Sequence, residues 1–249
     1  MKNIAVIILA AGKGTRMKSS TAKVLHCIRQ KPMIQFVVDT AIRLAGSDVI
    51  VVVGTQASSV MRVVSNEYPM VRFALQENQL GTGHAVLCAI PELGEDIEHV
   101  LILCGDVPFL KTTTLASLVE THVGENNTIT IVGAQLENPY GYGRLVVNGQ
   151  NRVCCIVEEA DATADEKRIQ LINTGIYCVN RNALEAMLTR ITPNNAQNEM
   201  YLTDIVGIAA DSGYQIGLVE CSDTNEILGI NTVADLEKAE SVIMPDEKP

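Results

Sequence analysis

Short apolar runs alternate with helical patterns through the first half of the chain, and this alternation restricts the fold more than any other feature. The expected strands are Ile4–Leu9, Val49–Val53, Val71–Leu75, Val100–Leu103 and Thr128–Val132. The expected helices are Pro32–Ala45, a stretch that ends near Asn66, one from about Gly83, and Thr112–His122. This order predicts an α/β fold with a mostly parallel sheet and right-handed crossovers. The chain is 47% hydrophobic, with few aromatic residues and no Trp, so its core must consist of Val, Ile, Leu and Ala. Such a composition is typical of a parallel sheet that is sandwiched by helices.

The pattern changes after about Gln135. Arg144–Val147 and Arg152–Val157 flank Asn148-Gly149, which predicts a small antiparallel hairpin lobe. The remaining expected elements are a strand at Ile176–Val179, helices near 181–190 and 203–212, a strand at Gln215–Val219 and a helix from Val233. A chain of 249 residues fits one large domain or two small lobes, and we expect residues 1–249 to form a single domain.

The first strand runs into a short loop, Leu9 to Met17, with the sequence LAAGKGTRM. Glycines let backbone N–H groups face an anion, and such a run forms a positively polarised concavity. Neither the Walker A spacing nor the G-x-G-x-x-G fingerprint fits the loop. Two interpretations stay open: a phosphate site in which Arg16 and Lys23 supply charge, and a plain glycine turn with solvated cations.

Two oxygen-bearing side chains are candidate ligands for Mg²⁺. Asp106, in ILCGDVPF, follows an expected strand, where a carboxylate is well placed for a hard cation and nucleotide phosphates. Asn231 precedes an N-cap pattern made by Thr232 and Asp235, so the helix does not need its carboxamide. For Asp106 a carboxylate held by loop amides is an open alternative, and for Asn231 a simple loop hydrogen bond is another.

Charge and composition exclude several classes of protein. The net charge is −10 without a basic cluster, so we expect no nucleic-acid partner. No apolar run reaches about 18 residues, so we expect no membrane segment and a soluble, cytoplasmic protein. The seven cysteines form no C-x-x-C pair and are expected to be buried reduced thiols rather than disulfides or zinc ligands. The four histidines show no metal or triad spacing, and we assign them no chemistry.

Motifs along the chain are similar to those of a known family. LAAGKGTRM with KVLH, QENQLGTGHA, GDVPF, NPYGYGR, VEEADAT, INTGIY, NNAQNEMYLTDI and GINT occur in that order between Ile4 and about Glu240. Together they resemble the uridylyltransferase domain of the bifunctional GlmU family, which makes UDP-N-acetylglucosamine. The first motif alone indicates only the wider sugar nucleotidyltransferase superfamily. The resemblance implies a Rossmann-like sheet of the nucleotide-diphospho-sugar transferase type and an Mg²⁺-dependent enzyme that uses UTP and N-acetylglucosamine-1-phosphate.

The resemblance also implies roles for individual residues. Arg16 would neutralise the departing pyrophosphate, Lys23 the transferred phosphoryl group, and Asp106 and Asn231 would hold the metal. The residues implied for the nucleotide are Leu9, Ala10, Ala11, Gly12, Gly14, Gln76, Gly81, Thr82 and Asp106, of which Gln76, Gly81 and Thr82 would contact uracil. The residues implied for the amino sugar are Gly143, Glu158, Asn173 and Thr203. On this basis residues to about 110 form the nucleotide part, about 111–231 the sugar part, and 232–249 a helix and tail.

The sequence departs from the family pattern at five positions. Ala22 stands where a Pro usually precedes the lysine, Cys104 where Tyr is frequent, and Ala160 where Lys is common. Asn198 and Met200 replace a usual Gly and Tyr. These changes leave the metal ligands and Arg16 in place but several border the sugar side. A nucleotidyltransferase for another hexose-1-phosphate or another nucleotide, and a non-catalytic sugar-nucleotide sensor, are therefore the alternative functions.

The family continues into a β-helix of hexapeptide repeats that acetylates glucosamine-1-phosphate and forms a trimer. These 249 residues contain no such repeat. We therefore expect uridylyl transfer without acetyl transfer, and a monomer or weak oligomer. Both a naturally short enzyme and a truncated form of a longer one fit the sequence.

Overall fold

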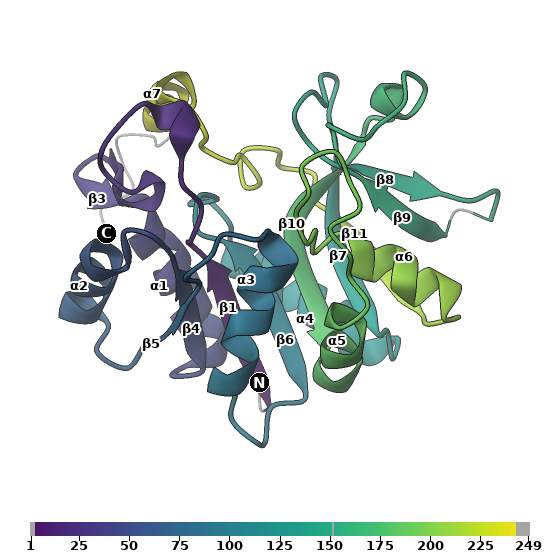
Figure 1. The fold of residues 1–249 in the computed structure, drawn as a ribbon, viewed down its shortest axis with the longest axis horizontal. Coiled ribbons are helices and arrows are strands. Elements are labelled where there is room, and N and C mark those ends of the chain that lie inside the picture. Colours follow the sequence, from purple (N-terminus) through teal and green to yellow (C-terminus); the bar gives the residue numbers. More distant parts are fainter. Residues whose placement is uncertain (1–2, 151, 243–249) are drawn as a thin grey trace.

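A mixed sheet forms the centre of the molecule in the computed structural model, which describes residues 3–150 and 152–242. Its strands are joined in the order β11-β7-β10-β6-β1-β4-β5 (Figure 1). In chain order they are β1 Ile4–Leu9, β4 Val49–Val53, β5 Arg72–Leu75, β6 His99–Cys104, β7 Ile129–Gln135, β10 Leu171–Asn180 and β11 Ile216–Glu220. The expected α/β architecture is confirmed: β1 and β4 have the expected bounds, and apart from β10 the other strands of the order above differ from expectation by one or a few residues.

One central strand, β10, runs opposite to its neighbours. It pairs antiparallel with both β6 and β7, whereas β1 is parallel to β4 and β6, and β11 is parallel to β7. Parallel strands need a long crossover, usually a helix. No α-helix lies between β7 and β10 in the described residues, so the chain returns in the opposite direction. The register of β10 shifts between Asn173 and Tyr177, around Gly175 with its φ of 78°. β10 begins at Leu171, well before the expected Ile176.

Helices cover both faces of the sheet (Figure 1). They are α1 Met33–Ala45, α2 Ala57–Glu67, α3 Thr82–Ala89, α4 Thr112–Gly124, α5 Arg181–Leu188, α6 Asp204–Asp211 and α7 Val233–Val242. Along β1, Val6 and Ile8 pack in a buried cluster with α1, α2 and α4, while Ala5 and Ile7 pack with α3, α5 and α6. Because successive strand residues face opposite sides, a strand buried on both faces must be apolar throughout, as IAVIIL is.

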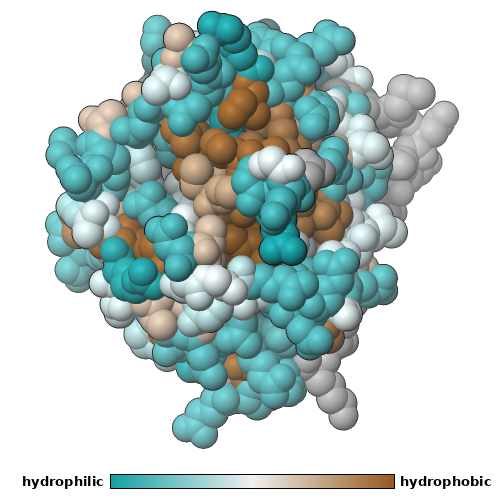
Figure 2. All heavy atoms as spheres, turned by 90° about the vertical axis from the view of Figure 1, so that its right-hand side faces the viewer, coloured by the Kyte–Doolittle hydropathy of each residue, from teal (hydrophilic) through white to brown (hydrophobic). Residues whose placement is uncertain are grey.

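The expected hairpin is present beside the main sheet. β8 Arg144–Val147 pairs antiparallel with β9 Val153–Val157, and Arg144 is also in register with Ile172 of β10. Figure 2 faces this side of the molecule, where apolar surface is broken by hydrophilic groups. A second, two-stranded sheet joins β2 Cys27–Ile28 to β3 Lys31–Pro32. Short 3₁₀ turns also occur in the described part of the chain: η1 Thr15–Met17, η2 Lys23–Leu25, η3 Ile90–Glu92 and η4 Glu166–Arg168.

The last helix packs back on the N-terminal half. Ala239 of α7 lies in one buried cluster with Ile28, Met33 and Ile230. This contact returns the segment before α7, which contains Asn231, to the region of the glycine loop. The tail expected after the helix falls at 243–249, outside the described residues.

All seven cysteines are free thiols, as expected. The expectation that they are buried is wrong for most of them: only Cys178 and Cys221 are buried, Cys27 is exposed and the others are half-buried. No helix in the described part of the chain has the length and apolar character needed to cross a membrane.

Candidate active site

The carboxyl ends of two neighbouring strands bring the glycine loop and GDVPF together. Leu9, the last residue of β1, is in register with Cys104, the last residue of β6. Gly105 then donates its backbone N–H to the Leu9 carbonyl at 2.9 Å. Ligand sites of open parallel sheets lie at this edge. The sheet therefore places the expected phosphate loop beside the expected metal ligand.

Four side chains expected to act on phosphate or metal meet at one point. The Lys23 ammonium pairs with the carboxylate of Asp106 and donates to Asn231 Oδ1 at 2.8 Å. Arg16 donates to the same Asn231 oxygen at 2.7 Å. Asn231 is held near Asp106 because the Ile230 N–H donates to the Asp106 carbonyl at 2.9 Å. Two oxygens thus converge on a cation, which is the arrangement that a hard metal ion requires.

The helix after Asn231 begins as expected. Asp235 accepts from the Thr232 N–H at 2.8 Å, and its own N–H donates to the Thr232 hydroxyl at 3.2 Å. This reciprocal pair is a capping box. The carboxamide oxygen of Asn231 is consequently directed to Lys23 and Arg16 rather than to the helix.

The glycine loop is open on its inner side. A Cβ on Gly12 would meet no atom within 4 Å, whereas one on Gly14 would lie 2.6 Å from Lys23 Cβ. Gly14 also has a φ of 59°, so this position favours glycine for both reasons. Among the described residues, the backbone N–H groups from Ala11 to Gly14 donate to no other protein group. These unpaired donors can bind phosphate oxygens.

The opposite wall carries the residues expected at the base. Gln76 is almost fully buried, and its carboxamide nitrogen lies 3.0 Å from both the Gly81 carbonyl and His84 Nδ1. A Cβ on Gly81, whose φ is 114°, would lie 2.6 Å from the Met200 carbonyl. The Thr82 hydroxyl accepts from the Leu202 N–H at 3.0 Å. Packing of the segment around Met200 therefore holds the start of α3 in place.

These groups line one cavity of about 470 Å³. All the residues expected to bind nucleotide or metal lie on its wall: Leu9, Ala10, Ala11, Gly12, Gly14, Arg16, Lys23, Gln76, Gly81, Thr82, Asp106 and Asn231. The sequence analysis missed further lining residues, namely Lys13, Val24, Gln79, Ala85 and Glu199. All five lie inside the quoted motifs, and that proximity was the available signal.

The four residues expected at the sugar do not line this cavity and form a group of their own. Asn173 donates its N–H to the Gly143 carbonyl at 2.8 Å, and the Thr203 hydroxyl donates to Glu158 at 3.1 Å. A Cβ on Gly143 would lie 3.4 Å from the Glu158 carboxylate. Tyr177 donates its hydroxyl to Asn173 Oδ1 at 2.9 Å and was not anticipated. One polar cluster is thus supplied by the hairpin, β10 and the start of α6.

Glu158 carries the main electrostatic feature of this cluster. Burial raises the pKa of its carboxyl, and Asp161 and Asp204 raise it further, while the hydrogen bond from Thr203 opposes the shift. Cys104 lies between the two groups: it lines the cavity, and its thiol donates to the carbonyl of Gly175, whose own N–H donates to Asn173 Oδ1 at 3.1 Å. Burial and the charge of Asp106 raise the pKa of Cys104 to about 12, so the thiol stays protonated at neutral pH.

Two departures from the family pattern have local explanations. Ala22 has φ −54° and ψ 135°, which a proline can also adopt. Asn198 has a φ of 53°. Asn is one of the few residues that tolerate this left-handed conformation, so it replaces Gly there at small cost.

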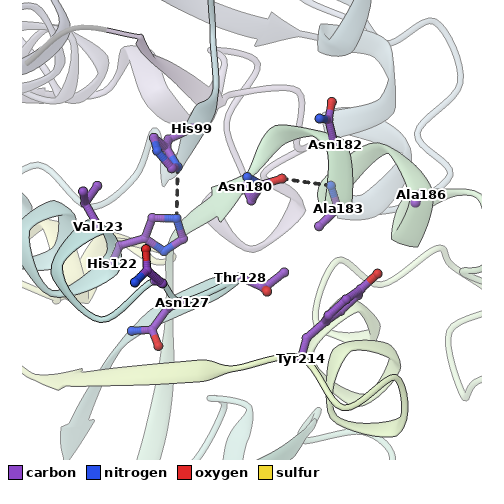
Figure 3. Close-up of a pocket in the computed structure, with 11 residues that line it drawn as sticks. His99, His122, Val123, Asn127, Thr128, Asn180, Asn182, Ala183, Ala186 and Tyr214 are labelled. Atoms are coloured by element: carbon purple, nitrogen blue, oxygen red, sulfur yellow. Dashed lines mark hydrogen bonds between the residues drawn. The ribbon is translucent and has the colours of Figure 1, made fainter.

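A second cavity, also about 470 Å³, lies at the opposite ends of the strands, near the starts of β6 and β7 (Figure 3). The fold brings together two histidines there whose spacing in sequence carries no signal. His122 is buried and its Nε2 lies 3.2 Å from His99 Nδ1. Burial and the neighbouring His99 lower the pKa of His122 to about 4, so its ring is neutral at neutral pH.

The residues of the candidate active site fit a magnesium ion. Among the described residues there is no cluster of three or more His, Cys, Asp or Glu side chains suited to a metal. Mg²⁺ does not need one, because it commonly uses one or two carboxylates, several waters and substrate phosphates. Asp106 and Asn231 already hold a cationic group, the ammonium of Lys23.

Comparison with known proteins shows the family to which the chain belongs. Residues 5–224 match the family model described as nucleotidyl transferase. The chain belongs to this nucleotidyl transferase family. Among its relatives is the bifunctional protein GlmU of Geotalea uraniireducens, 45% identical over 96% of this chain and 52% of the relative. The bifunctional protein GlmU of Desulfotalea psychrophila is 40% identical over 95% of this chain and 69% of its own length. The resemblance stated from the motifs is confirmed.

This nucleotidyl transferase spans about half the length of the first curated relatives that it matches. A solved structure from Bacillus anthracis, to which glucose-1-phosphate thymidylyltransferase activity is attributed and which was determined with sucrose, has the same fold. Its TM-score is 0.76 at 19% identity, covering 99% of this chain and 97% of that one.

Proposed function

We propose that the protein transfers the uridylyl group of UTP to N-acetylglucosamine-1-phosphate, giving UDP-N-acetylglucosamine and pyrophosphate. The observation that carries the proposal is the convergence of Arg16, Lys23, Asp106 and Asn231 beside the free amides of the glycine loop. Relatives named as bifunctional GlmU support the choice of substrates.

In this reaction a phosphate oxygen of the sugar phosphate forms a bond to the α-phosphorus of UTP, and the bond from that phosphorus to pyrophosphate breaks. Positioning and charge neutralisation dominate such chemistry, so no protein nucleophile is needed. The amides of the glycine loop would bind the triphosphate, Arg16 the departing pyrophosphate and Lys23 the transferred phosphoryl group. Asp106 and Asn231 would hold Mg²⁺, which supplies Lewis-acid stabilisation of the phosphate charge.

We assign Gln76, Gly81 and Thr82 to the base and Gly143, Glu158, Asn173 and Thr203 to the amino sugar. Half-buried Glu158 can accept hydrogen bonds from sugar hydroxyls, and Thr203 already uses one of its lone pairs in this way. The division into a nucleotide part to about residue 110 and a sugar part over about 111–231 belongs to the same proposal.

We further propose that the chain acts in the cytoplasm as a monomer or weak oligomer. The seven free thiols suit a reducing compartment. Light scattering at micromolar protein tests the assembly, and a stable trimer would contradict it.

A substrate panel tests the proposed reaction. Pyrophosphate release is measured with each of the four NTPs against several hexose-1-phosphates, with Mg²⁺ present. UTP with N-acetylglucosamine-1-phosphate should give the highest kcat/KM, and a different best pair would replace the proposed substrates. Asp106→Ala should lower turnover by roughly 10²–10³-fold, the scale of removing one preorganised charge-stabilising group. Release by no pair would favour a sensor that binds without turnover.

A further inference from the structure

The ammonium of Lys23 occupies the place between the two oxygens that we assign to the metal. It pairs with the Asp106 carboxylate and lies 2.8 Å from Asn231 Oδ1. The pair is largely shielded from water, with 15% of the Lys23 side chain and 20% of the Asp106 side chain exposed. The same lysine is therefore bound to the metal ligands instead of being free for phosphate.

The Asn231 oxygen already accepts from both Lys23 and Arg16, so its two lone pairs are occupied, and the Lys23 ammonium lies against the Asp106 carboxylate. A divalent ion therefore competes with the ammonium for these oxygens. Both are hard, positively charged groups that need the same lone pairs, and their charges repel each other at close range. A lysine side chain has a flexible stem and carries its charge at the tip, so the head can move while the backbone stays in place. Gly14 packs against Lys23 Cβ, which holds the base of the stem near the loop amides.

We propose that Lys23 is a built-in competitor for the metal site, and that a divalent cation enters only by displacing its ammonium towards the nucleotide phosphates. This inference rests on the proposed function. Displacement is unfavourable while no phosphate is present to receive the ammonium. Metal and nucleotide binding are consequently coupled, and linkage makes each favour the other equally. Without nucleotide, the protein therefore has a low affinity for divalent ions.

Binding of Mn²⁺ alone tests the competition without any catalysis. Free Mn²⁺ is quantified by electron paramagnetic resonance during titration of the nucleotide-free protein. Lys23→Met should bind Mn²⁺ about tenfold more tightly than the unsubstituted protein, within the range for residues in direct contact. Lys23→Gln serves the same purpose if the Met variant does not fold.

Lys13→Met is the matched control, because it removes one positive charge from the same cavity wall. Among the described residues, Lys13 has no ion pair or hydrogen bond with Asp106 or Asn231. Its effect measures the general gain in cation affinity from lost positive charge. In an Asp106→Asn background, Lys23→Met should give a smaller gain than in the unsubstituted protein, because the contested carboxylate is absent and only Asn231 Oδ1 is still shared.

Equal Mn²⁺ affinity of the Lys23→Met and Lys13→Met variants would overturn the competition, even if the substrate panel confirms uridylyl transfer. Conversely, a substrate panel without pyrophosphate release would overturn the proposed function. Tighter Mn²⁺ binding by Lys23→Met than by Lys13→Met would still show that lysine and metal compete. The two failures are therefore distinguishable.

Discussion

Gly12→Ala should raise the thermal stability of the protein and at the same time weaken its binding of UTP. A methyl group at Gly12 meets no protein atom within 4 Å, and the residue does not have a left-handed φ. The folded state therefore gains no clash or strain. The unfolded chain loses conformational entropy, which stabilises the protein by about 0.4–1 kcal/mol. For a chain of this length that corresponds to a rise in Tm of roughly 1–4 °C.

The same methyl group stands on the open side of the loop whose amides we assign to the triphosphate. Losing one hydrogen bond to a charged phosphate costs about 1.5–3 kcal/mol. The Kd for UTP should therefore rise between about tenfold and a hundredfold. Isothermal titration with UTP and Mg²⁺ gives the affinity, and thermal unfolding without ligand gives the stability.

Gly124→Ala is the control for this comparison. Gly124 is the last residue of α4 and follows Val123, which lines the second cavity rather than the candidate active site. A Cβ on Gly124 would also meet no atom within 4 Å. Its Tm should rise similarly with no change in UTP affinity. If Gly12→Ala binds UTP like the unsubstituted protein, the loop does not bind phosphate through this open face. A fall in its Tm would show that the space around Gly12 is needed for folding.

Three further substitutions test other parts of the site. Gln76→Ala should weaken UTP binding and reduce discrimination among the four NTPs, because base groups lose a partner; unchanged NTP preference would remove Gln76 from the base site. Glu158→Gln should raise the KM for the sugar phosphate. The raised pKa of Glu158 means that ionisation destabilises the folded state, so the Tm advantage of Glu158→Gln should grow as pH rises above the ordinary pKa of 4.5. A constant advantage from pH 4 to 7 would contradict this. Ala22→Pro should stabilise the protein by about 0.4–1 kcal/mol, since φ is −54° and the Ala22 N–H donates to no described residue. A lower Tm would refute it.

The sequence by itself determined most elements and the position of the glycine loop at the end of the first strand. Local patterns are sufficient there: IAVIIL must be buried on both faces, and the glycines of LAAGKGTRM must form a loop rather than continue the strand. The cap of α7 was also readable, because Thr232 and Asp235 interact within one turn. In each case the deciding contacts lie within a few residues, or follow from a regular period.

Only the tertiary structure decided the direction of β10 and the partners of Lys23. The direction of β10 depends on how the chain returns from the hairpin, and its place between β6 and β7 depends on contacts distant in sequence. The sequence predicted Lys23 as a cation for phosphate, but Asn231, 208 positions later, and Asp106 receive its ammonium in the folded chain. α7 packs on the N-terminal half and so brings Asn231 to this point. Such long-range contacts are absent from any local window, since they arise only when separate elements bury their apolar faces together.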